Sequence, residues 1–401
     1  MDIIIQPGLL SGEIPAVPSK SQAHRLLICA AFAHAPTVLT CPDSNQDIDA
    51  TVRCLRALGA EITRREDGFL VAPVRAVPGT AALDCGESGS TLRFLLPIAG
   101  ALGVNATFRL AGRLPQRPLS PLWEEMERMG CCLSRPSADT ILCTGQLSPG
   151  DYSISGSVSS QFITGMLFAL MLLPGQSTLT VTGKVESAPY IRMTLSAMGA
   201  FGVRVPQESL RFTVTSQALR SPGTLQVEGD WSNAAFWLAA NALGSRVTIT
   251  GLNEASAQGD KKIGDFLRQL ESPAVIDAGQ TPDLIPVLAA AAGAKAGAVF
   301  TNAGRLRLKE SDRLLTTAAM LRSLGGCAQI RGDELIVSGG DYRGGTVDAA
   351  GDHRIAMAAA IAATVCTEPV TILGAEAVTK SYPHFWADYR RAGGNYEQHF
   401  R

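Results

Sequence analysis

A recurring pair of helices constrains the fold of this 401-residue chain more than any other feature of its sequence. The first helix of each pair is apolar on nearly every side and begins with small polar or charged residues. A helix that is apolar all round has to be buried, whereas the second helix of each pair is amphipathic and ends near a glycine. The buried helices are predicted at Leu26–Phe32, Leu92–Ala101, Phe162–Leu173, Ala234–Leu243, Leu284–Ala292 and Ile355–Val365. The outer helices are predicted at Asp47–Gly59, Pro118–Gly130, Pro189–Gly199, Asp260–Leu270, Ser311–Gly325 and Pro383–Gly393.

These helix pairs recur with a period of about 70 residues, with one shorter interval between residues 230 and 280. Short β-branched or alternating runs bounded by Gly and Pro lie between the helices, and such runs are typical of strands. Each repeat therefore has roughly the order β-α-β-α-β-β, and six repeats predict two α/β domains of three repeats each. The strands are predicted at Thr37–Thr40, Gly68–Ala72, Asn105–Leu110, Thr140–Thr144, Ser177–Val181, Leu210–Val214, Arg246–Thr250, Ala298–Thr301, Glu334–Val337 and Val370–Leu373.

Two segments indicate where the chain passes from one domain to the other. Gly223–Val227 is a strand near the midpoint of the chain. Met1–Pro7 is a strand that precedes the first repeat helix, so it can belong with the C-terminal half. We therefore expect residues 1–18 and 228–401 to form one discontinuous domain and residues 19–227 to form the other, with two chain crossings and the active site in the cleft between the domains.

Composition excludes several classes of function. The chain has 35 Lys and Arg against 36 Asp and Glu, so it has no overall basic field for nucleic acid. No apolar run reaches the ~20 residues of a membrane span. Nine cysteines without a C-x-x-C pair favour reduced thiols in the cytoplasm. The five histidines form no metal-ligand spacing with cysteine, and no P-loop occurs, so neither a metal nor a cofactor is predicted. We expect a cytoplasmic monomer that acts on small molecules, with no nucleic-acid or membrane partner.

Basic residues gather at the starts of helices and in loops, and this placement favours a small polyanion as ligand. The first turn of a helix has unpaired N–H groups and is the positive end of the helix dipole, so it attracts anions. Lys20 and Arg25 flank the first buried helix, and phosphate or carboxylate groups are the natural partners of such cations. The other basic residues in comparable positions are Arg93, Arg113, Arg117, Lys309, Arg313, Arg354 and Lys380.

The segment from Lys309 to Arg313 carries the clearest indication of catalysis. Ser311 or Asp312 can cap the following helix, but a capping turn does not account for Lys309 and Glu310 beside Arg313. A carboxylate among cations stays ionised and can exchange protons with a neighbouring ammonium group. This segment is therefore predicted to take part in proton transfer.

An ordered set of motifs extends this interpretation. The motifs are Pro18-Ser19-Lys20-Ser21, Gly86-Glu87-Ser88-Gly89-Ser90-Thr91-Leu92-Arg93, Arg117-Pro118-Leu119, Ser157-Val158-Ser159-Ser160-Gln161, Val227-Glu228-Gly229-Asp230, Lys309-Glu310-Ser311-Asp312-Arg313 and Asp352-His353-Arg354-Ile355-Ala356-Met357. With these motifs in this order, the chain from about Leu10 to Tyr389 resembles the family of EPSP synthases (3-phosphoshikimate 1-carboxyvinyltransferases), which are enolpyruvyl transferases of the shikimate pathway. The resemblance implies two inside-out α/β barrel domains. It also implies transfer of the enolpyruvyl group of phosphoenolpyruvate to the 5-hydroxyl of shikimate 3-phosphate, by addition and elimination through a tetrahedral intermediate with release of phosphate.

The same resemblance implies a set of site residues. Asp283 would take the proton of the attacking hydroxyl, and Glu310 and Lys20 would handle the proton at the methylene carbon of phosphoenolpyruvate. The residues implied to bind phosphoenolpyruvate are Lys20, Gly89, Arg117, Gln161, Arg313, Arg354 and Lys380. Those implied to bind shikimate 3-phosphate are Ser21, Arg25, Ser159, Ser160, Gln161, Ser187, Asp283 and Lys309, with Tyr190 nearby.

Two alternatives remain open from the sequence. One is the related enolpyruvyl transferase that acts on UDP-N-acetylglucosamine, which resembles the chain less at Lys309–Arg313 and usually carries a reactive loop cysteine. The other is a non-catalytic homologue that only binds polyanions. The presence of both Asp283 and Glu310 argues against the second alternative, because carboxylates in a cationic site do not help to bind an anion.

Overall fold

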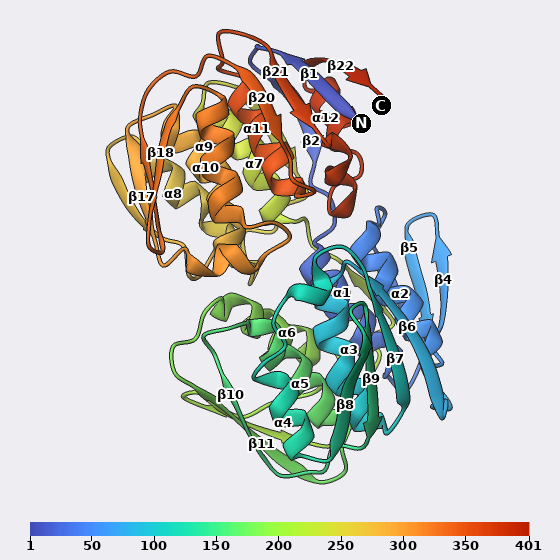
Figure 1. Ribbon diagram of the computed structural model, residues 1–401. Helices are drawn as coiled ribbons and strands as arrows, with labels where there is room; N and C mark the ends of the chain where they lie inside the picture. Colours follow the sequence, from blue (N-terminus) through green and yellow to red (C-terminus); the bar gives the residue numbers. More distant parts are fainter. Residues whose placement is uncertain (401) are drawn as a thin grey trace. The chain divides into compact units, whose positions relative to one another are not determined.

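The computed structural model describes residues 1–400, and the chain divides into two compact units (Figure 1). One consists of Met1–Ser19 and the chain from Glu228 onward, and the other of Lys20–Val227. We call them the terminal unit and the middle unit, after their places in the sequence. Each unit has its own hydrophobic core, so each can be described by itself.

The middle unit contains three repeats, and each repeat forms one four-stranded sheet. The first two strands of each sheet are parallel and the remaining pairs are antiparallel. The sheet orders are β14-β3-β5-β4, β6-β7-β9-β8 and β10-β11-β13-β12, so the strand that ends the unit completes its first repeat. That repeat comprises β14 (Thr224–Gln226), α1 (Lys20–Ala31), β3 (Thr37–Thr40), α2 (Gln46–Ala57), β4 (Glu61–Arg65) and β5 (Gly68–Ala72). The second comprises β6 (Thr80–Gly86), α3 (Gly89–Leu102), β7 (Asn105–Leu110), the 3₁₀ helix η1 (Leu114–Gln116), α4 (Leu122–Arg128), β8 (Cys131–Ser137) and β9 (Thr140–Gly145). The third comprises β10 (Asp151–Ser155), α5 (Ser160–Leu172), β11 (Gln176–Thr182), α6 (Ala188–Ala200), β12 (Gln207–Glu208) and β13 (Arg211–Thr215).

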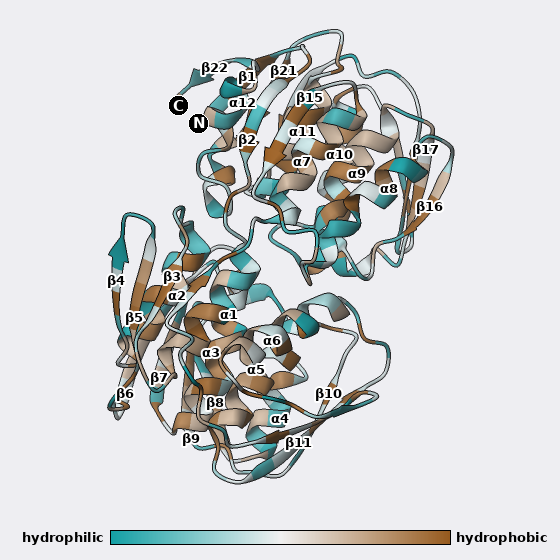
Figure 2. Ribbon diagram, turned by 180° about the vertical axis from the view of Figure 1, so that it is seen from behind, coloured by the Kyte–Doolittle hydropathy of each residue, from teal (hydrophilic) through white to brown (hydrophobic). Residues whose placement is uncertain are grey.

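The first helices of these repeats, α1, α3 and α5, form the core of the middle unit. Figure 2 shows α3 and α5 as largely hydrophobic, and nearly every residue of both helices is buried. The two helices pack closely because Gly165 has no side chain: a Cβ there would lie 2.1 Å from the carbonyl oxygen of Arg93. The Ser88 and Ser159 side chains cap the N-termini of α3 and α5, and such a cap contributes about 1 kcal/mol.

The terminal unit follows the same plan, and its sheets recruit strands from the start of the chain. The sheet orders are β16-β17-β19-β18, β20-β21-β1-β22 and β15-β2, so β1 (Asp2–Gln6) and β2 (Ser11–Pro15) each complete a C-terminal repeat. The repeat with β2 continues with α7 (Trp231–Ala242), β15 (Arg246–Thr250), η2 (Gly259–Lys262) and α8 (Ile263–Gln269). The next comprises β16 (Ala274–Asp277), η3 (Pro282–Leu284), α9 (Ile285–Gly293), β17 (Gly297–Thr301), η4 (Gly304–Leu308), α10 (Arg313–Ser323), β18 (Cys327–Arg331) and β19 (Glu334–Ser338). The last comprises β20 (Gly345–Asp348), α11 (His353–Ala363), β21 (Val370–Leu373), η5 (Ala375–Lys380), α12 (Phe385–Arg391) and β22 (Asn395–His399).

Two details of the predicted repeats are wrong. The repeat that contains α7 keeps only two strands, because residues 270–273 alone separate α8 from β16 and leave no length for a further hairpin. The outer helix predicted from Pro118 begins at Leu122, with Pro121 at its N-cap. A proline has no N–H to donate and disfavours helical backbone in the residue before it. Arg117 consequently lies in extended backbone after η1.

The two places where the chain passes between the units are paired with each other. Pro18 and Gly229 form an antiparallel bridge. The Ser19 N–H donates to the Glu228 carbonyl at 2.8 Å, and the Asp230 N–H donates to the Val17 carbonyl at 2.8 Å. Within residues 1–400, no helix combines the length and apolar character needed to cross a membrane.

Candidate active site

The polar starts of the buried helices meet at one end of the middle unit. Gln161, in the first turn of α5, donates from Nε2 to Ser90 Oγ of α3 at 2.9 Å. Its Oε1 accepts a hydrogen bond from Arg93 Nη1 at 2.9 Å. The Gln161 amide is therefore held at both ends, which determines its orientation. Ser159 caps the same helix by accepting from the Gln161 N–H at 3.2 Å, and Ser160 follows it as the first helical residue.

Lys20, the first residue of α1, forms an ion pair within this unit. Its Nζ lies 2.8 Å from Asp47 Oδ2, and the two side chains are 16% and 8% exposed. Asp47 lies in the first turn of α2, which Asn45 caps. Asp47 could not be recognised from the sequence as a partner of Lys20, because an acidic residue in a first turn is also what the helix dipole favours. The contact provides Lys20 with a fixed anionic partner.

A chain of hydrogen bonds lies close to the Lys20–Asp47 pair. His24 Nδ1 and Thr51 Oγ1 are 2.7 Å apart, Thr51 Oγ1 and Thr91 Oγ1 are 2.7 Å apart, and Thr91 donates to Ser88 Oγ at 2.7 Å. Burial lowers the pKa of His24 to about 3, with Lys20 and Arg25 acting in the same direction against Asp47. The His24 imidazole is therefore neutral, and the chain links α1, α2 and α3 without adding charge.

Arg25 lies in the first turns of α1 and is buried inside the middle unit. Its side chain is 2% exposed. Its guanidinium donates to Thr194 Oγ1 at 2.9 Å, to the Ser21 carbonyl at 2.6 Å and to the Tyr190 carbonyl at 3.1 Å. Helical periodicity turns position 25 toward the interior, where these contacts tie α1 to α6. Arg25 therefore holds Ser21 and Tyr190 in place through hydrogen bonds to their backbone carbonyls.

Gly89 brings the backbone of α3 against two guanidinium groups. A Cβ at Gly89 would lie 2.7 Å from Arg117 Nη1 and 2.8 Å from Arg93 Nη1. Arg117 is therefore adjacent to the N-terminus of α3, although the two residues are far apart in sequence. Ser187, the N-cap residue of α6, is buried and has a positive φ of 56°.

Arg313 is the centre of an ionic network in the terminal unit. Its side chain is 1% exposed, and it contacts three carboxylates. Nε lies 2.7 Å from Asp352 Oδ2, Nη1 lies 2.8 Å from Asp283 Oδ1, and Nη2 lies 2.7 Å from Glu310 Oε2. Asp352 is fully buried and also caps α11, so it anchors the network. Asp352 belongs to a motif quoted above, but its pairing with Arg313 was not predicted.

Asp283 lies among three cations. Lys309 Nζ is 3.2 Å and Arg313 Nη1 is 2.8 Å from Oδ1, and Arg354 Nη2 is 3.4 Å from Oδ2. Burial by itself would raise the pKa of Asp283, but Arg354, Lys309 and Arg313 together hold this pKa well below its usual range. The Asp283 carboxylate is therefore ionised at neutral pH.

Two further cations of the predicted set lie in this unit. Arg354 follows the cap of α11; its Nη2 donates to Ser232 Oγ at 2.7 Å and its Nη1 to the Asp283 carbonyl at 3.1 Å. Lys380 ends η5 and is 6% exposed. The sequence-predicted residues Asp283, Lys309, Glu310, Arg313 and Arg354 thus form one contiguous group. The arrangement combines two carboxylates with cations suited to phosphate and carboxylate groups.

Replacing Arg313 by alanine is expected to lower the free energy of unfolding by about 3–5 kcal/mol, because it leaves buried carboxylates without their cation. Chemical denaturation monitored by tryptophan fluorescence measures this loss. Arg268→Ala is the matched control, since Arg268 also pairs with a carboxylate three residues away, that of Asp265, but is 76% exposed. Equal stability of the two variants would contradict the network's role.

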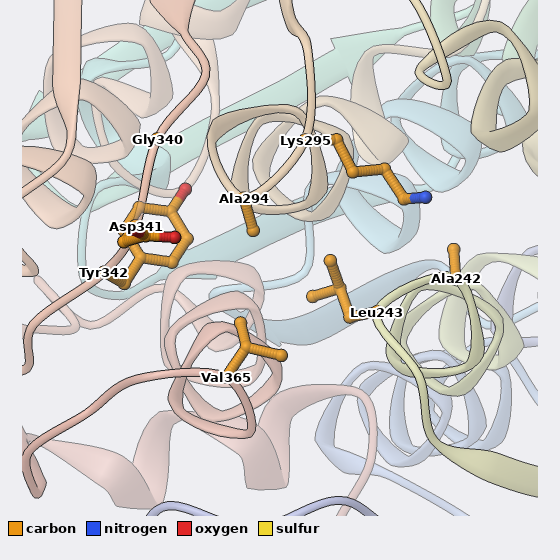
Figure 3. A pocket seen from close by; sticks show the side chains of 8 residues that line it. All are labelled: Ala242, Leu243, Ala294, Lys295, Gly340, Asp341, Tyr342 and Val365. Carbon is orange, nitrogen blue, oxygen red and sulfur yellow. The ribbon is translucent and has the colours of Figure 1, made fainter.

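A cavity in the terminal unit lies apart from these residues. It has a volume of about 200 Å³ and lies at the C-terminal ends of α7, α9 and α11 (Figure 3). Leu243, Val365 and Tyr342 are among its lining residues, and none of the predicted site residues is. In the part of the chain that the structure describes, no group of three or more His, Cys, Asp or Glu side chains is placed to hold a metal ion.

Known proteins of one family match nearly the whole chain. The profile of the family EPSP synthase (3-phosphoshikimate 1-carboxyvinyltransferase) matches residues 4–285 and 269–389. A 3-phosphoshikimate 1-carboxyvinyltransferase of Clostridium kluyveri is 38% identical over 424 aligned residues, covering 99% of this chain and 98% of the relative. The corresponding protein of Clostridioides difficile is 35% identical, covering 98% of each chain.

Solved structures agree on the fold. An EPSP synthase from Acinetobacter baumannii superposes with a TM-score of 0.82 at 24% identity, covering 99% of this chain and 100% of that one. The enolpyruvyl transferase NikO from Streptomyces tendae gives a TM-score of 0.76 at 18% identity, covering 99% and 98%. The two-domain inside-out α/β fold that the resemblance implied is confirmed. With the full-length sequence matches, these findings show that the chain belongs to the EPSP synthase family and is an enolpyruvyl transferase.

Proposed function

We propose that this protein transfers the enolpyruvyl group of phosphoenolpyruvate to the 5-hydroxyl of shikimate 3-phosphate and releases phosphate. The observation that carries the proposal is the placement of Asp283 and Glu310 on one buried arginine, Arg313. A site that only bound polyanions would gain nothing from these carboxylates, whereas proton transfer requires them.

Each substrate has its own set of proposed binding groups. Phosphoenolpyruvate would bind to five cationic side chains, to the backbone at Gly89 and to the amide of Gln161. The cationic side chains are those of Lys20, Arg117, Arg313, Arg354 and Lys380. Shikimate 3-phosphate would bind to Arg25, Asp283 and Lys309 and to four serine hydroxyl groups. These hydroxyl groups belong to Ser21, Ser159, Ser160 and Ser187. Gln161 would contact both substrates. Arg25 acts in this scheme by holding Ser21, whose carbonyl it contacts at 2.6 Å.

In the addition step, the oxygen of the 5-hydroxyl bonds to C2 of phosphoenolpyruvate while the methylene carbon gains a proton. Asp283 takes the hydroxyl proton, and Glu310 or Lys20 supplies the proton to carbon. Elimination then removes a proton from the same carbon and breaks the bond from C2 to the phosphate oxygen. The cations stabilise charge on the intermediate and on the leaving phosphate. Two bound polyanions also offset the cations around Asp283, which raises its pKa and makes it a better base.

Phosphate release tests this proposal directly. The protein is incubated without added metal with phosphoenolpyruvate and either shikimate 3-phosphate or UDP-N-acetylglucosamine. Release with shikimate 3-phosphate alone is the expected result. Release with only the sugar nucleotide would assign the chain to the other enolpyruvyl transferase. Binding of both proposed substrates without release, from folded protein, would indicate a non-catalytic role.

The affinity for shikimate 3-phosphate is expected to fall above about pH 8. Burial lowers the pKa of Lys309 to about 8, against the opposing effect of Asp283. Lys309 is therefore cationic below that pH and becomes neutral as the pH rises through it, which removes one positive charge from the proposed binding group. The measurement is kcat/KM for shikimate 3-phosphate between pH 6 and 10. A Lys309→Arg variant should retain its kcat/KM through pH 9, and an identical decline in that variant would contradict this assignment.

We further propose that the protein acts as a monomer in the cytoplasm. Reduced cysteines are consistent with that compartment, and the nine cysteines among residues 1–400 are free thiols. Light scattering on the purified protein should give the mass of one chain.

A further inference from the structure

Arg354 stands farther from the Asp283 carboxylate than the other cations of its group do. Its Nη2 lies 3.4 Å from Oδ2, whereas Arg313 Nη1 lies 2.8 Å and Lys309 Nζ lies 3.2 Å from Oδ1. A guanidinium that bonds closely to a carboxylate approaches it to about 2.7–2.9 Å. The Arg354 side chain is only 5% exposed, so a neighbouring protein group is the natural cause of this separation.

The hydroxyl of Ser232 is this neighbouring group. Its Oγ accepts a hydrogen bond from Nη2 of Arg354 at 2.7 Å, the same nitrogen that faces the Asp283 carboxylate. The other terminal nitrogen, Nη1, donates to the backbone carbonyl of Asp283 at 3.1 Å. Nε of Arg354 is buried and has no hydrogen-bond partner within residues 1–400. The orientation of the guanidinium therefore depends on its two terminal nitrogens, and Ser232 makes the shortest bond to them.

Ser232 is held in place independently of this bond, because it lies in the first turn of α7. Asp230 caps this helix by accepting from the Asn233 N–H at 2.9 Å. Gln258 Oε1 accepts from the Trp231 N–H at 3.0 Å, so the residues on both sides of Ser232 are tied. Ser232 itself is 9% exposed. Its hydroxyl is therefore a fixed acceptor to which the longer and more flexible arginine side chain adapts.

We propose that Ser232 is a positioning residue for Arg354: its hydroxyl keeps the guanidinium from closing onto the Asp283 carboxylate, so that Arg354 remains available to an anionic group of phosphoenolpyruvate. This inference rests on the proposed function for its choice of substrate. It assigns to a neutral serine the task of keeping two opposite charges of the site apart.

The hydrogen-bonding chemistry of the three groups supports this assignment. A guanidinium can only donate hydrogen bonds, and a buried donor without an acceptor is costly. If the Ser232 hydroxyl is removed, the acceptor next in distance to Nη2 is the Asp283 carboxylate, whose bond to a cation is stronger than that of a hydroxyl. A close pair of Arg354 and Asp283 would then compete with a substrate anion for the same guanidinium.

Ser232→Ala is therefore expected to raise the KM for phosphoenolpyruvate by about tenfold, the loss typical of one hydrogen bond to a charged group. The KM for shikimate 3-phosphate should stay unchanged, because Arg354 is not assigned to that substrate. Steady-state phosphate release, with each substrate varied in turn, measures both constants. An unchanged KM for phosphoenolpyruvate, or an equal rise in both KM values, would overturn the inference.

Two further substitutions at this position separate the hydrogen bond from packing. Ser232→Thr retains the hydroxyl and should keep the wild-type KM for phosphoenolpyruvate. Ser232→Cys fills nearly the same space with a weak acceptor, so its KM should rise as in Ser232→Ala; a wild-type KM in the cysteine variant would contradict the role of the hydroxyl. Ser245→Ala is the matched control, because Ser245 is a 5% exposed serine of the same unit that accepts from the Leu10 N–H at 3.0 Å. It should lower the melting temperature and leave both KM values unchanged.

A measurement that needs no turnover distinguishes failure of this inference from failure of the proposed function. In spectra of ¹⁵N-arginine-labelled protein, the Nε–H signal that Arg354→Lys removes belongs to Arg354. This signal should move in Ser232→Ala and Ser232→Cys, and it should keep its wild-type position in Ser232→Thr and Ser245→Ala. A signal that does not move in Ser232→Ala overturns the inference. An inactive wild type whose Arg354 signal still depends on the Ser232 hydroxyl would overturn the proposed function alone.

Discussion

Replacing Lys20 by methionine is expected to lower the rate of phosphate release by about 10²–10⁴-fold, the range of a lost general acid or base. Lys20 is the one proposed proton carrier in the middle unit, and Asp47 holds its ammonium group at 2.8 Å. Methionine keeps much of the length of the side chain but can neither donate a proton nor balance Asp47. Stopped-flow or coupled phosphate assays with both substrates measure the effect.

Two controls separate proton transfer from lost packing. Lys295→Met changes a lysine that is also 16% exposed and also paired with a carboxylate, that of Glu271 at 2.6 Å. It should leave the rate of phosphate release within twofold of the wild type. In the Lys20→Arg variant the ion pair with Asp47 is retained, but the guanidinium group binds its proton too tightly to exchange it. A rate close to the wild type in Lys20→Met would remove Lys20 from the mechanism.

The Glu310→Ala variant is expected to be as severely impaired, with phosphate release lowered by about 10²–10⁴-fold. Glu310 is 14% exposed and is held by Arg313 Nη2 at 2.7 Å, so its carboxylate is fixed beside that guanidinium. Its removal leaves Asp283 and Asp352 paired with Arg313, and the network should persist. Kinetics and a thermal melt on the same preparation test both expectations.

Glu125→Gln is the control for this variant. Glu125 is 9% exposed and pairs with Arg128 three residues later at 2.7 Å, the same spacing as Glu310 and Arg313. Its substitution should reduce stability without affecting turnover. If Glu310→Ala released phosphate at the wild-type rate, the catalytic assignment of this carboxylate would fall, and the Arg313 network would be only a structural feature.

Much of the fold could be predicted from the sequence, because the signals are local. An apolar run such as Phe162–Leu173 specifies a buried helix by its own composition, and the period of about 70 residues specifies the repeats. The predicted helix start at Pro118 failed for a reason that is also local, since prolines at 118 and 121 shift the start of α4 to Leu122. The missing hairpin after α8 could have been expected from the short interval before β16.

The candidate site was predictable only as a set of residue types at helix starts. The sequence analysis identified Lys309, Glu310 and Arg313 because they lie within five residues, and the structure places them in one group. Asp47 was not predicted as a site residue, since an acidic residue near a helix start has the same pattern whether it complements the dipole or pairs with a distant side chain. The burial of Arg25 could not be predicted locally, because it depends on α6, which lies far along the chain.

The sequence by itself determined the repeats, their strand and helix types and the polar starts of the buried helices, because these depend on periodicity and capping within one or two turns of chain. Only the tertiary structure decided which charges meet. Asp47 lies 27 residues from Lys20, Asp352 lies 39 residues from Arg313, and Ser232 lies 122 residues from Arg354. Such pairs form because packed sheets and helices bring their ends together, and the energy of an ion pair depends on that distance and on burial, neither of which is encoded in local spacing.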